Sequence, residues 1–189
     1  MGPRDTPPPL PDLEGNMLGQ ADIKIIHRPC NWMQGWEGEM DTVHQAILHS
    51  FNVKVQDTRP GTFEHYIVVN RPPRFNVIDT PFGTSYGAYR PAEEDSWYWR
   101  IAHMLFPFYA MIPTGALGHE VRFGAYVPMD DTHTLHWEVW ATVPHEGELP
   151  LGAMGRPPAR PDAMWQPNTT DWYGRFNLVQ GLDNDFLVD

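Results

Sequence analysis

Regular alternation of apolar and polar side chains in the second half of the chain is the feature that most constrains its fold. Residues 133–143 put Leu135, Trp137, Val139, Ala141 and Val143 on one face, and His136, Glu138, Trp140 and Thr142 on the other. Residues 121–127 alternate in the same way, with Val121, Phe123, Ala125 and Val127 opposite Arg122, Gly124 and Tyr126. A period of two residues is typical of strands in an antiparallel sheet with one covered face. The pattern therefore predicts such a sheet.

Shorter segments predict further strands and one helix. Strands are predicted over residues 21–26, 64–70, 74–79, 84–90 and 97–106, and the last is dense in aromatic residues and expected to be largely buried. Residues 36–50 are small or apolar without proline and predict a helix. Prolines favour an extended chain over residues 1–14 and a loop after about residue 146. Several strands with few helices predict an α+β domain.

Composition narrows the possible partners and compartments. A length of 189 residues suits one domain, and the 41% hydrophobic content supplies a core. The net charge of −11 argues against a nucleic-acid partner, because phosphate binding requires clustered basic residues. The single cysteine excludes a disulfide framework and is compatible with a reducing cytoplasm. No apolar run reaches the roughly 18 residues that a membrane span requires.

Within the predicted helix, Asp41, His44 and His49 form a D-x-x-H-x-x-x-x-H pattern. Two neutral imidazoles and one carboxylate can hold Fe(II) with coordination positions left open, but only the two histidines are candidates here. Without further context, histidines near an apolar helix are more often packed or exposed than bound to a metal. By spacing alone, a solvated or capping role explains Asp41 as well as a functional role does. On a straight helix His44 and His49 would lie about 140° apart. A shared metal therefore predicts a π-bulge or a helix break between them.

The residues around this pattern resemble a known family. The run 30–44, Cys-Asn-Trp-Met-Gln-Gly-Trp-Glu-Gly-Glu-Met-Asp-Thr-Val-His, resembles the N-W-L-Q-x-x-E-G-x-x-D-[ST]-x-H signature of Rieske non-haem iron oxygenases. It is similar to the phthalate-dioxygenase-like branch of ring-hydroxylating alpha subunits. Further matches lie at residues 7–11, 79–83, 86–90, 127–132 and 183–189.

The resemblance implies a fold and roles for individual residues. The fold would be a START-like helix-grip domain, a curved antiparallel sheet with helices around an iron and substrate cavity. His44 and His49 would bind Fe(II), and the third ligand, an aspartate, would lie beyond Asp189. Asp41 would bridge a ligand histidine to the Rieske histidine of a neighbouring subunit and carry electrons between the two centres. Glu37, one turn earlier, would support the site from outside the ligand set, although a plain surface role is as well supported.

One departure from the family concerns the cluster. A Rieske [2Fe–2S] cluster needs two cysteines and two histidines, and Cys30 is the only cysteine. The resemblance makes residues 1–14 a lead-in from a Rieske domain and residues 15–189 an incomplete catalytic domain. The complete enzyme would be a homotrimer that takes NAD(P)H electrons from a reductase and uses O2 to hydroxylate or dihydroxylate an aromatic or related compound. The chain alone is expected to be inactive.

Two alternatives stay open. The chain could be a non-enzymatic helix-grip module that binds an apolar ligand, or an inactive fragment. Three further histidines are better explained without a function. His136 shares the polar strand face with Glu138, His133 lies at the start of that strand, and His103 is expected to be a buried, hydrogen-bonded histidine. Six residues could line a substrate cavity, although core packing is the better explanation for most of them: Trp97, Tyr98, Trp99, Phe106, Phe108 and Met111. Asp183, Asp185 and Asp189 are not assigned as the missing ligand, because the matching segment of the family does not bind the metal.

Overall fold

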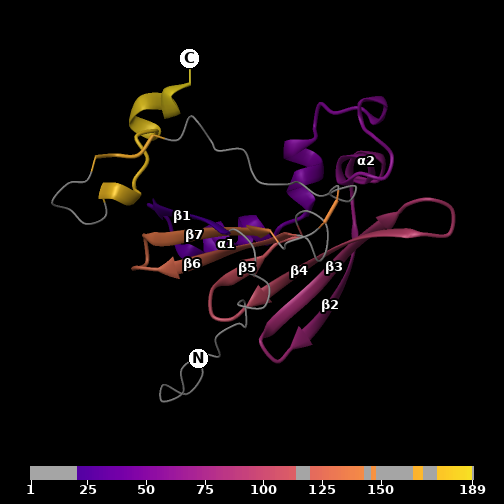
Figure 1. The fold of residues 1–189 in the computed structure, drawn as a ribbon, viewed down its shortest axis with the longest axis horizontal. Helices are drawn as coiled ribbons and strands as arrows, with labels where there is room; N and C mark the ends of the chain where they lie inside the picture. The colour runs from indigo at the N-terminus through magenta and orange to yellow at the C-terminus, as the bar shows by residue number, and fades with distance from the viewer. Residues whose placement is uncertain (1–20, 114–119, 143–145, 148–163, 168–173, 189) are drawn as a thin grey trace.

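The computed structural model describes residues 21–113, 120–142, 146–147, 164–167 and 174–188. Their centre is an antiparallel sheet with the strand order β1-β7-β6-β5-β4-β3-β2 (Figure 1). The strands are β1 Ala21–Arg28, β2 Arg74–Thr80, β3 Gly83–Pro91, β4 Trp97–Leu105, β5 Tyr109–Met111, β6 Glu120–Pro128 and β7 Thr134–Thr142. The helices are α1 Trp32–Met40, the π-helix η2 Gln45–His49, α2 Phe63–Val69, and the 3₁₀ segments η3 Val55–Asp57, η4 Gly174–Phe176 and η5 Leu182–Leu187. The predicted α+β class is confirmed.

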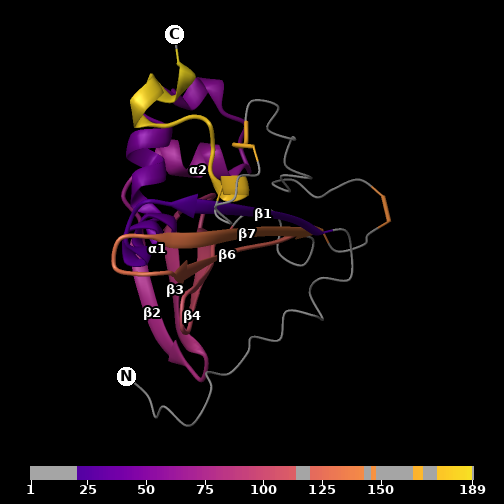
Figure 2. The same cartoon turned by 90° about the vertical axis from the view of Figure 1, so that its left-hand side faces the viewer.

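The sheet is strongly twisted, as the predicted curvature requires. Figure 2 shows β1, β6 and β7 running across the direction of β2, β3 and β4. Helix α1 packs on one face of this sheet, where Ala88, Ala102 and Ala110 are fully buried. Their small side chains let the helix approach, and the aromatic rings of Tyr86 and Tyr126 fill the space beside Met40. No helix of the described residues is long and apolar enough to cross a membrane.

The strand predictions over 21–26, 74–79, 84–90, 121–127 and 133–143 are confirmed to within a few residues. The strand predicted over 64–70 is wrong, because these residues form α2. The hydroxyl of Thr62 accepts a hydrogen bond from the backbone N–H of His65 and so caps that helix. Ile67 and Val68 are buried against Ala46, and the buried ring of Tyr66 stacks on Tyr98. This packing gives a helix despite the β-branched residues. Residues 1–14 and most residues after 147 lie outside the described ranges.

Two further predictions need correction. The single helix predicted over 36–50 is wrong: α1 begins at Trp32 and ends at Met40, and a separate helical segment follows. The strand over 97–106 exists as β4, but it is not largely buried, since Trp97, Trp99 and Ile101 are 46–51% exposed. The register places these three with Ser85 and Gly87, on the sheet face away from α1. The short strand β5 was not predicted.

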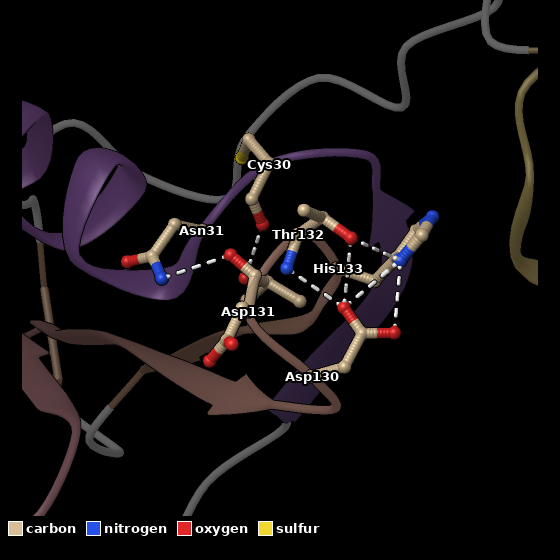
Figure 3. Close-up of polar contacts among 7 residues, drawn as sticks. Cys30, Asn31, Asp130, Asp131, Thr132 and His133 are labelled. Carbon is tan, nitrogen blue, oxygen red and sulfur yellow. Dashed lines mark hydrogen bonds and ion pairs between the residues drawn. The ribbon is translucent and has the colours of Figure 1, made fainter.

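The start of α1 is tied to the turn between β6 and β7 (Figure 3). The side chain of Asn31 caps α1 by accepting from the backbone N–H of Met33 at 2.9 Å, and its amide donates to the carbonyl of Asp131 at 3.0 Å. The hydroxyl of Thr134 donates to the carbonyl of Cys30 at 2.8 Å. Two segments that resemble the oxygenase family, 30–44 and 127–132, therefore meet in space and fix where α1 begins.

Candidate metal centre

Asp41 is the joint between α1 and the helical segment that carries both histidines. Its backbone is extended and ends α1, with the N–H donating to the carbonyl of Glu37 at 3.0 Å. Its carboxylate then accepts from the backbone N–H groups of Val43 at 2.8 Å and His44 at 3.2 Å. An aspartate in this position satisfies the first donors of the next helix. The capping role considered for Asp41 is therefore present in the structure.

The same carboxylate also faces the ring of His44. Asp41 Oδ2 lies 3.2 Å from His44 Nδ1, close enough for a hydrogen bond. A carboxylate on one imidazole nitrogen fixes the orientation of the ring and keeps the proton on that nitrogen. The Nε2 atom of His44 is then the nitrogen that can bind a metal.

The π-helix η2 brings the second histidine close to the first. The ring centroids of His44 and His49 lie 5.1 Å apart with the planes inclined by 59°. A π-helix places residues i and i+5 on the same side, which a regular α-helix does not. Of the two possibilities predicted, a π-bulge or a helix break, the structure has the π-helical turn. Ala46 is fully buried against Ile67 and Val68 of α2 and anchors the opposite side of η2.

The C-terminal end of α1, next to Asp41, is fixed to the sheet by polar contacts that the sequence did not reveal. The hydroxyl of Tyr86 donates to the carbonyl of Met40, and the hydroxyl of Tyr126 donates to the carboxylate of Glu39. The indole N–H of Trp36 donates to the carbonyl of Tyr109 at 3.2 Å. Tyr86 lies in a segment that resembles the family, 86–90, and that match was the one available signal for it.

A cluster of titratable side chains, formed by His136, Glu39, Arg28 and Tyr126, lies next to this end of α1. His136 is 4% exposed, stacks on the ring of Tyr126 and holds Nε2 3.7 Å from Glu39 Oε2. Arg28 donates to His136 Nδ1 at 3.2 Å, which places the histidine proton on Nε2. Burial lowers the pKa of His136 to about 4 and raises the pKa of Glu39. The close approach allows an ion pair, but burial favours the neutral forms of both groups, and we take His136 as neutral.

His136 was predicted on the polar, uncovered face of its strand, and this is a correction. Helix α1 covers that face, so His136 is buried among Tyr126, Glu39 and Arg28. The other histidines have local partners: His103 Nδ1 lies 2.7 Å from the hydroxyl of Ser85, and His133 Nδ1 lies 3.0 Å from Asp130. Burial lowers the pKa of His103. His103 is thus a half-buried histidine with a hydrogen-bond partner, as predicted, whereas His133 is a partly exposed residue just before β7.

The remaining candidate residues do not join the histidine pair. Glu37 is exposed and offers Asp41 its backbone carbonyl, so a role for its carboxylate stays a prediction. Asp183 and Asp185 are exposed residues of η5, and Asp189 lies outside the described ranges. Within the part of the chain that the structure describes, no three His, Cys, Asp or Glu side chains gather as a metal site would require. The described residues thus offer two candidate metal ligands, the imidazoles of His44 and His49.

A shallow hollow of about 160 Å³ lies elsewhere, on β2, β3 and β4. It is lined by Asn76, Ile78, Ser85, Tyr86, Gly87, Trp99 and Ile101. Most of these residues share the sheet face away from α1, so the hollow is not a cavity beside His44 and His49. Of the residues considered for a substrate cavity, Trp99 lines this hollow, whereas Tyr98 stacks on Tyr66 of α2.

Comparisons with known proteins agree with the resemblance. The family model described as "LigXa C-terminal domain like" matches residues 1–148. The oxygenase subunit of 3-chlorobenzoate-3,4-dioxygenase from Comamonas testosteroni is 36% identical over 100% of this chain and 45% of its own length. The phthalate 4,5-dioxygenase oxygenase subunit from Pseudomonas putida is 31% identical over 72% of this chain and 33% of its own length. The chain thus spans less than half the length of these two relatives.

A solved structure, the terminal oxygenase of carbazole 1,9a-dioxygenase from Nocardioides aromaticivorans IC177, aligns with a TM-score of 0.40 at 16% identity. The alignment covers 67% of this chain and 40% of that one. Because the family model covers most of the chain, membership follows from the sequence match. The chain belongs to the LigXa C-terminal-domain-like family, the catalytic-domain family of Rieske-type ring-hydroxylating oxygenase subunits.

Proposed function

We propose that this chain forms part of the catalytic domain of an oxygenase that hydroxylates or dihydroxylates an aromatic or related organic compound. Family membership and the names of the dioxygenase relatives support the reaction class. The observation that carries the proposal is the histidine pair, whose rings a π-helix holds with centroids 5.1 Å apart. Two imidazoles placed in this way are suited to a shared metal ion.

His44 and His49 are the proposed ligands. Asp41 keeps the proton of His44 on Nδ1, so Nε2 offers its lone pair to the metal. The third ligand is proposed to be an aspartate beyond Asp189. Mononuclear Fe(II) held there would supply the activation of O2, using NAD(P)H electrons that arrive through a reductase and a Rieske [2Fe–2S] cluster.

Asp41 has a second proposed role. Its side chain is 46% exposed, so part of the carboxylate is accessible from outside while Oδ2 faces His44. In a homotrimer, the Rieske histidine of a neighbouring subunit would bind this exposed side. The carboxylate would then join that histidine to His44 and form the path for electrons between subunits. A cluster site must come from another domain, because Cys30 is the single cysteine.

Iron titration of the purified chain tests the ligand assignment. Wild type should bind about one Fe(II) weakly, because two imidazoles lack the anionic third ligand. His44→Ala and His49→Ala should each weaken binding by about tenfold or more.

The matched control is His133→Ala, since His133 also pairs through Nδ1 with an aspartate three residues earlier. That variant should bind iron like wild type. Equal binding by all four proteins would remove the ligand assignment. Absence of binding in wild type would leave the apolar-ligand module or the inactive fragment.

A further inference from the structure

The guanidinium of Arg71 lies at the C-terminal end of the π-helix that carries the histidine pair. Its Nη1 donates to the carbonyls of Ala46 and Ser50, the latter at 3.2 Å, and its Nη2 lies 3.5 Å from the carbonyl of Val53. Arg71 follows α2, so these contacts reach back over 18 to 25 residues of sequence. One side chain therefore gathers three carbonyls at the point where η2 ends.

These carbonyls need a partner from outside the helix. The last carbonyls of a helix have no donor within it, and they carry partial negative charge. A π-helix is also rare, so tertiary contacts must stabilise it against regular helix. The planar guanidinium offers several donors in fixed directions together with a positive charge, which matches this group of acceptors. The hydroxyl of Ser50 contributes one more contact, to the carbonyl of Gln45 at 3.0 Å.

A second arginine fixes the backbone from which Arg71 extends. Arg90 of β3 is fully buried, and it donates from Nε to the carbonyl of Asn70 at 2.8 Å and from Nη2 to that of Arg71 at 3.2 Å. The sheet therefore holds residues 70 and 71, and Arg71 holds η2. This chain of contacts links β3 to the segment that sets the spacing of His44 and His49.

We infer that Arg71 is a positioning residue for the metal-binding histidine pair: it stabilises the π-turn that brings His44 and His49 to one side. The inference rests on the proposed role of the two histidines as metal ligands. Arg71 itself touches neither ring in the described contacts; it acts through the main chain of η2. Its loss should therefore change the geometry of the pair while the sheet stays folded.

The test compares Arg71→Lys and Arg71→Gln with wild type, and uses Arg59→Lys, an exposed arginine, as the matched control. Hydrogen exchange on the metal-free protein gives the first measurement. Amides of residues 45–50 should exchange about tenfold faster or more in Arg71→Gln, and by an intermediate factor in Arg71→Lys, which keeps the charge but offers a single point donor. Amides of β3 and β4 should not change.

Copper(II) supplies a metal probe with a spectroscopic signature. It binds imidazole more tightly than Fe(II) does, and the nitrogen couplings in its paramagnetic resonance spectrum count the bound rings. The part of the copper spectrum that belongs to the histidine pair is the part that disappears when His44 and His49 are both changed to alanine. That part should show two nitrogens in wild type and in Arg59→Lys. In Arg71→Gln it should weaken by roughly 10- to 100-fold and lose one nitrogen.

The two readouts separate this inference from the proposed function. A wild-type copper signal independent of both histidines would count against the proposed function, and hydrogen exchange would still decide the role of Arg71. Unchanged exchange in residues 45–50 with an unchanged two-nitrogen spectrum in both Arg71 variants would overturn the inference. Loss of the whole fold in both variants would also overturn it, because Arg71 would then be a general structural residue.

Discussion

The hydroxyl of Tyr86 on β3 donates a hydrogen bond to the main-chain carbonyl of Met40, the last residue of α1. Burial raises the pKa of Tyr86 to about 12, so the hydroxyl keeps its proton at neutral pH. The accepting carbonyl belongs to the end of a helix, where no intrahelical donor remains. Because Asp41 follows Met40 directly, this contact fixes the backbone from which the carboxylate reaches His44.

Tyr86→Phe should destabilise the protein by about 1–3 kcal/mol, because it leaves a buried carbonyl without a donor and removes few apolar contacts. Urea unfolding followed by tryptophan fluorescence measures the change. The control is Tyr89→Phe on the same strand, whose half-buried ring stacks on Trp99. That substitution keeps the stacking ring and should cost under about 0.5 kcal/mol. Equal losses for the two variants would show that the bond to Met40 contributes little.

How much the sequence could predict differs between the sheet and the helices. Period-two alternation located β6 and β7, since a strand shows its two faces directly in its side chains. It could not tell what covers each face. His136 was therefore placed on an open polar face that α1 in fact buries. The prediction for Trp99 was wrong in the opposite direction. Its strand was expected to be largely buried, but Trp99 lies exposed on the face that α1 leaves uncovered.

For the helices and the site, too, local sequence predicted some features, whereas tertiary packing decided others. Helix geometry, combined with the shared metal that the family resemblance implies, predicted a π-bulge or a helix break between His44 and His49, and the structure has the π-helix. Residues 66–69 favour a strand locally, but the cap at Thr62 and burial against Ala46 decide for α2. Arg71 was not predictable, because its partners lie 18 to 25 residues away and depend on tertiary packing.

Two glycines of α1 should respond oppositely to alanine. A Cβ at Gly35 would lie 2.6 Å from a ring carbon of Tyr126, whereas a Cβ at Gly38 would have no atom within 4 Å. Gly35→Ala should therefore push α1 away from the sheet and cost about 1–3 kcal/mol. Gly38→Ala should stabilise by up to about 1 kcal/mol, because alanine favours helix. Thermal unfolding of both variants checks this, and stabilisation by Gly35→Ala would show that α1 does not sit tightly on Tyr126.

Stability should depend on pH through His136. Its folded pKa of about 4 lies below the ordinary value of 6.5, so between these values the unfolded chain binds a proton that the folded chain does not. This group therefore contributes full stability above about pH 6.5, and the contribution falls as pH drops towards 4. The loss is at most about 3 kcal/mol. The pKa of Glu39 is raised, so its contribution to stability has the opposite sign and is lost as pH rises. The other charged groups around His136 are Arg28, Arg122, Glu138 and Lys24.

His136→Gln isolates that contribution, because other titrating groups remain in both proteins. The free energy of unfolding should fall less steeply from pH 6.5 to 4 in the variant than in wild type. His133→Gln is the control, since His133 lies in the turn before β7 with its side chain 41% exposed. Parallel curves for wild type and His136→Gln would mean that His136 is not held neutral by its surroundings.

The proposed role of Asp41 is best tested by Asp41→Asn in a protein that joins this chain to a Rieske domain and to the proposed third ligand. The fold should survive, because asparagine also caps helices and can accept from the N–H of Val43. Iron should still bind, because His44 and His49 are unchanged. Electron transfer from the reduced cluster should nevertheless slow severely, because an amide has no second anionic oxygen to bind both His44 and a Rieske histidine.

Stopped-flow reoxidation of the reduced cluster measures this step, with Asp130→Asn as the matched control. Asp130 contacts His133 Nδ1 at 3.0 Å with the same three-residue spacing, but it lies in the turn between β6 and β7. Its variant should transfer electrons at the wild-type rate. A purely capping role for Asp41 predicts a stability change under about 0.5 kcal/mol and an unchanged rate. A rate for Asp41→Asn within about twofold of wild type would therefore leave Asp41 as a helix cap and remove it from the electron path.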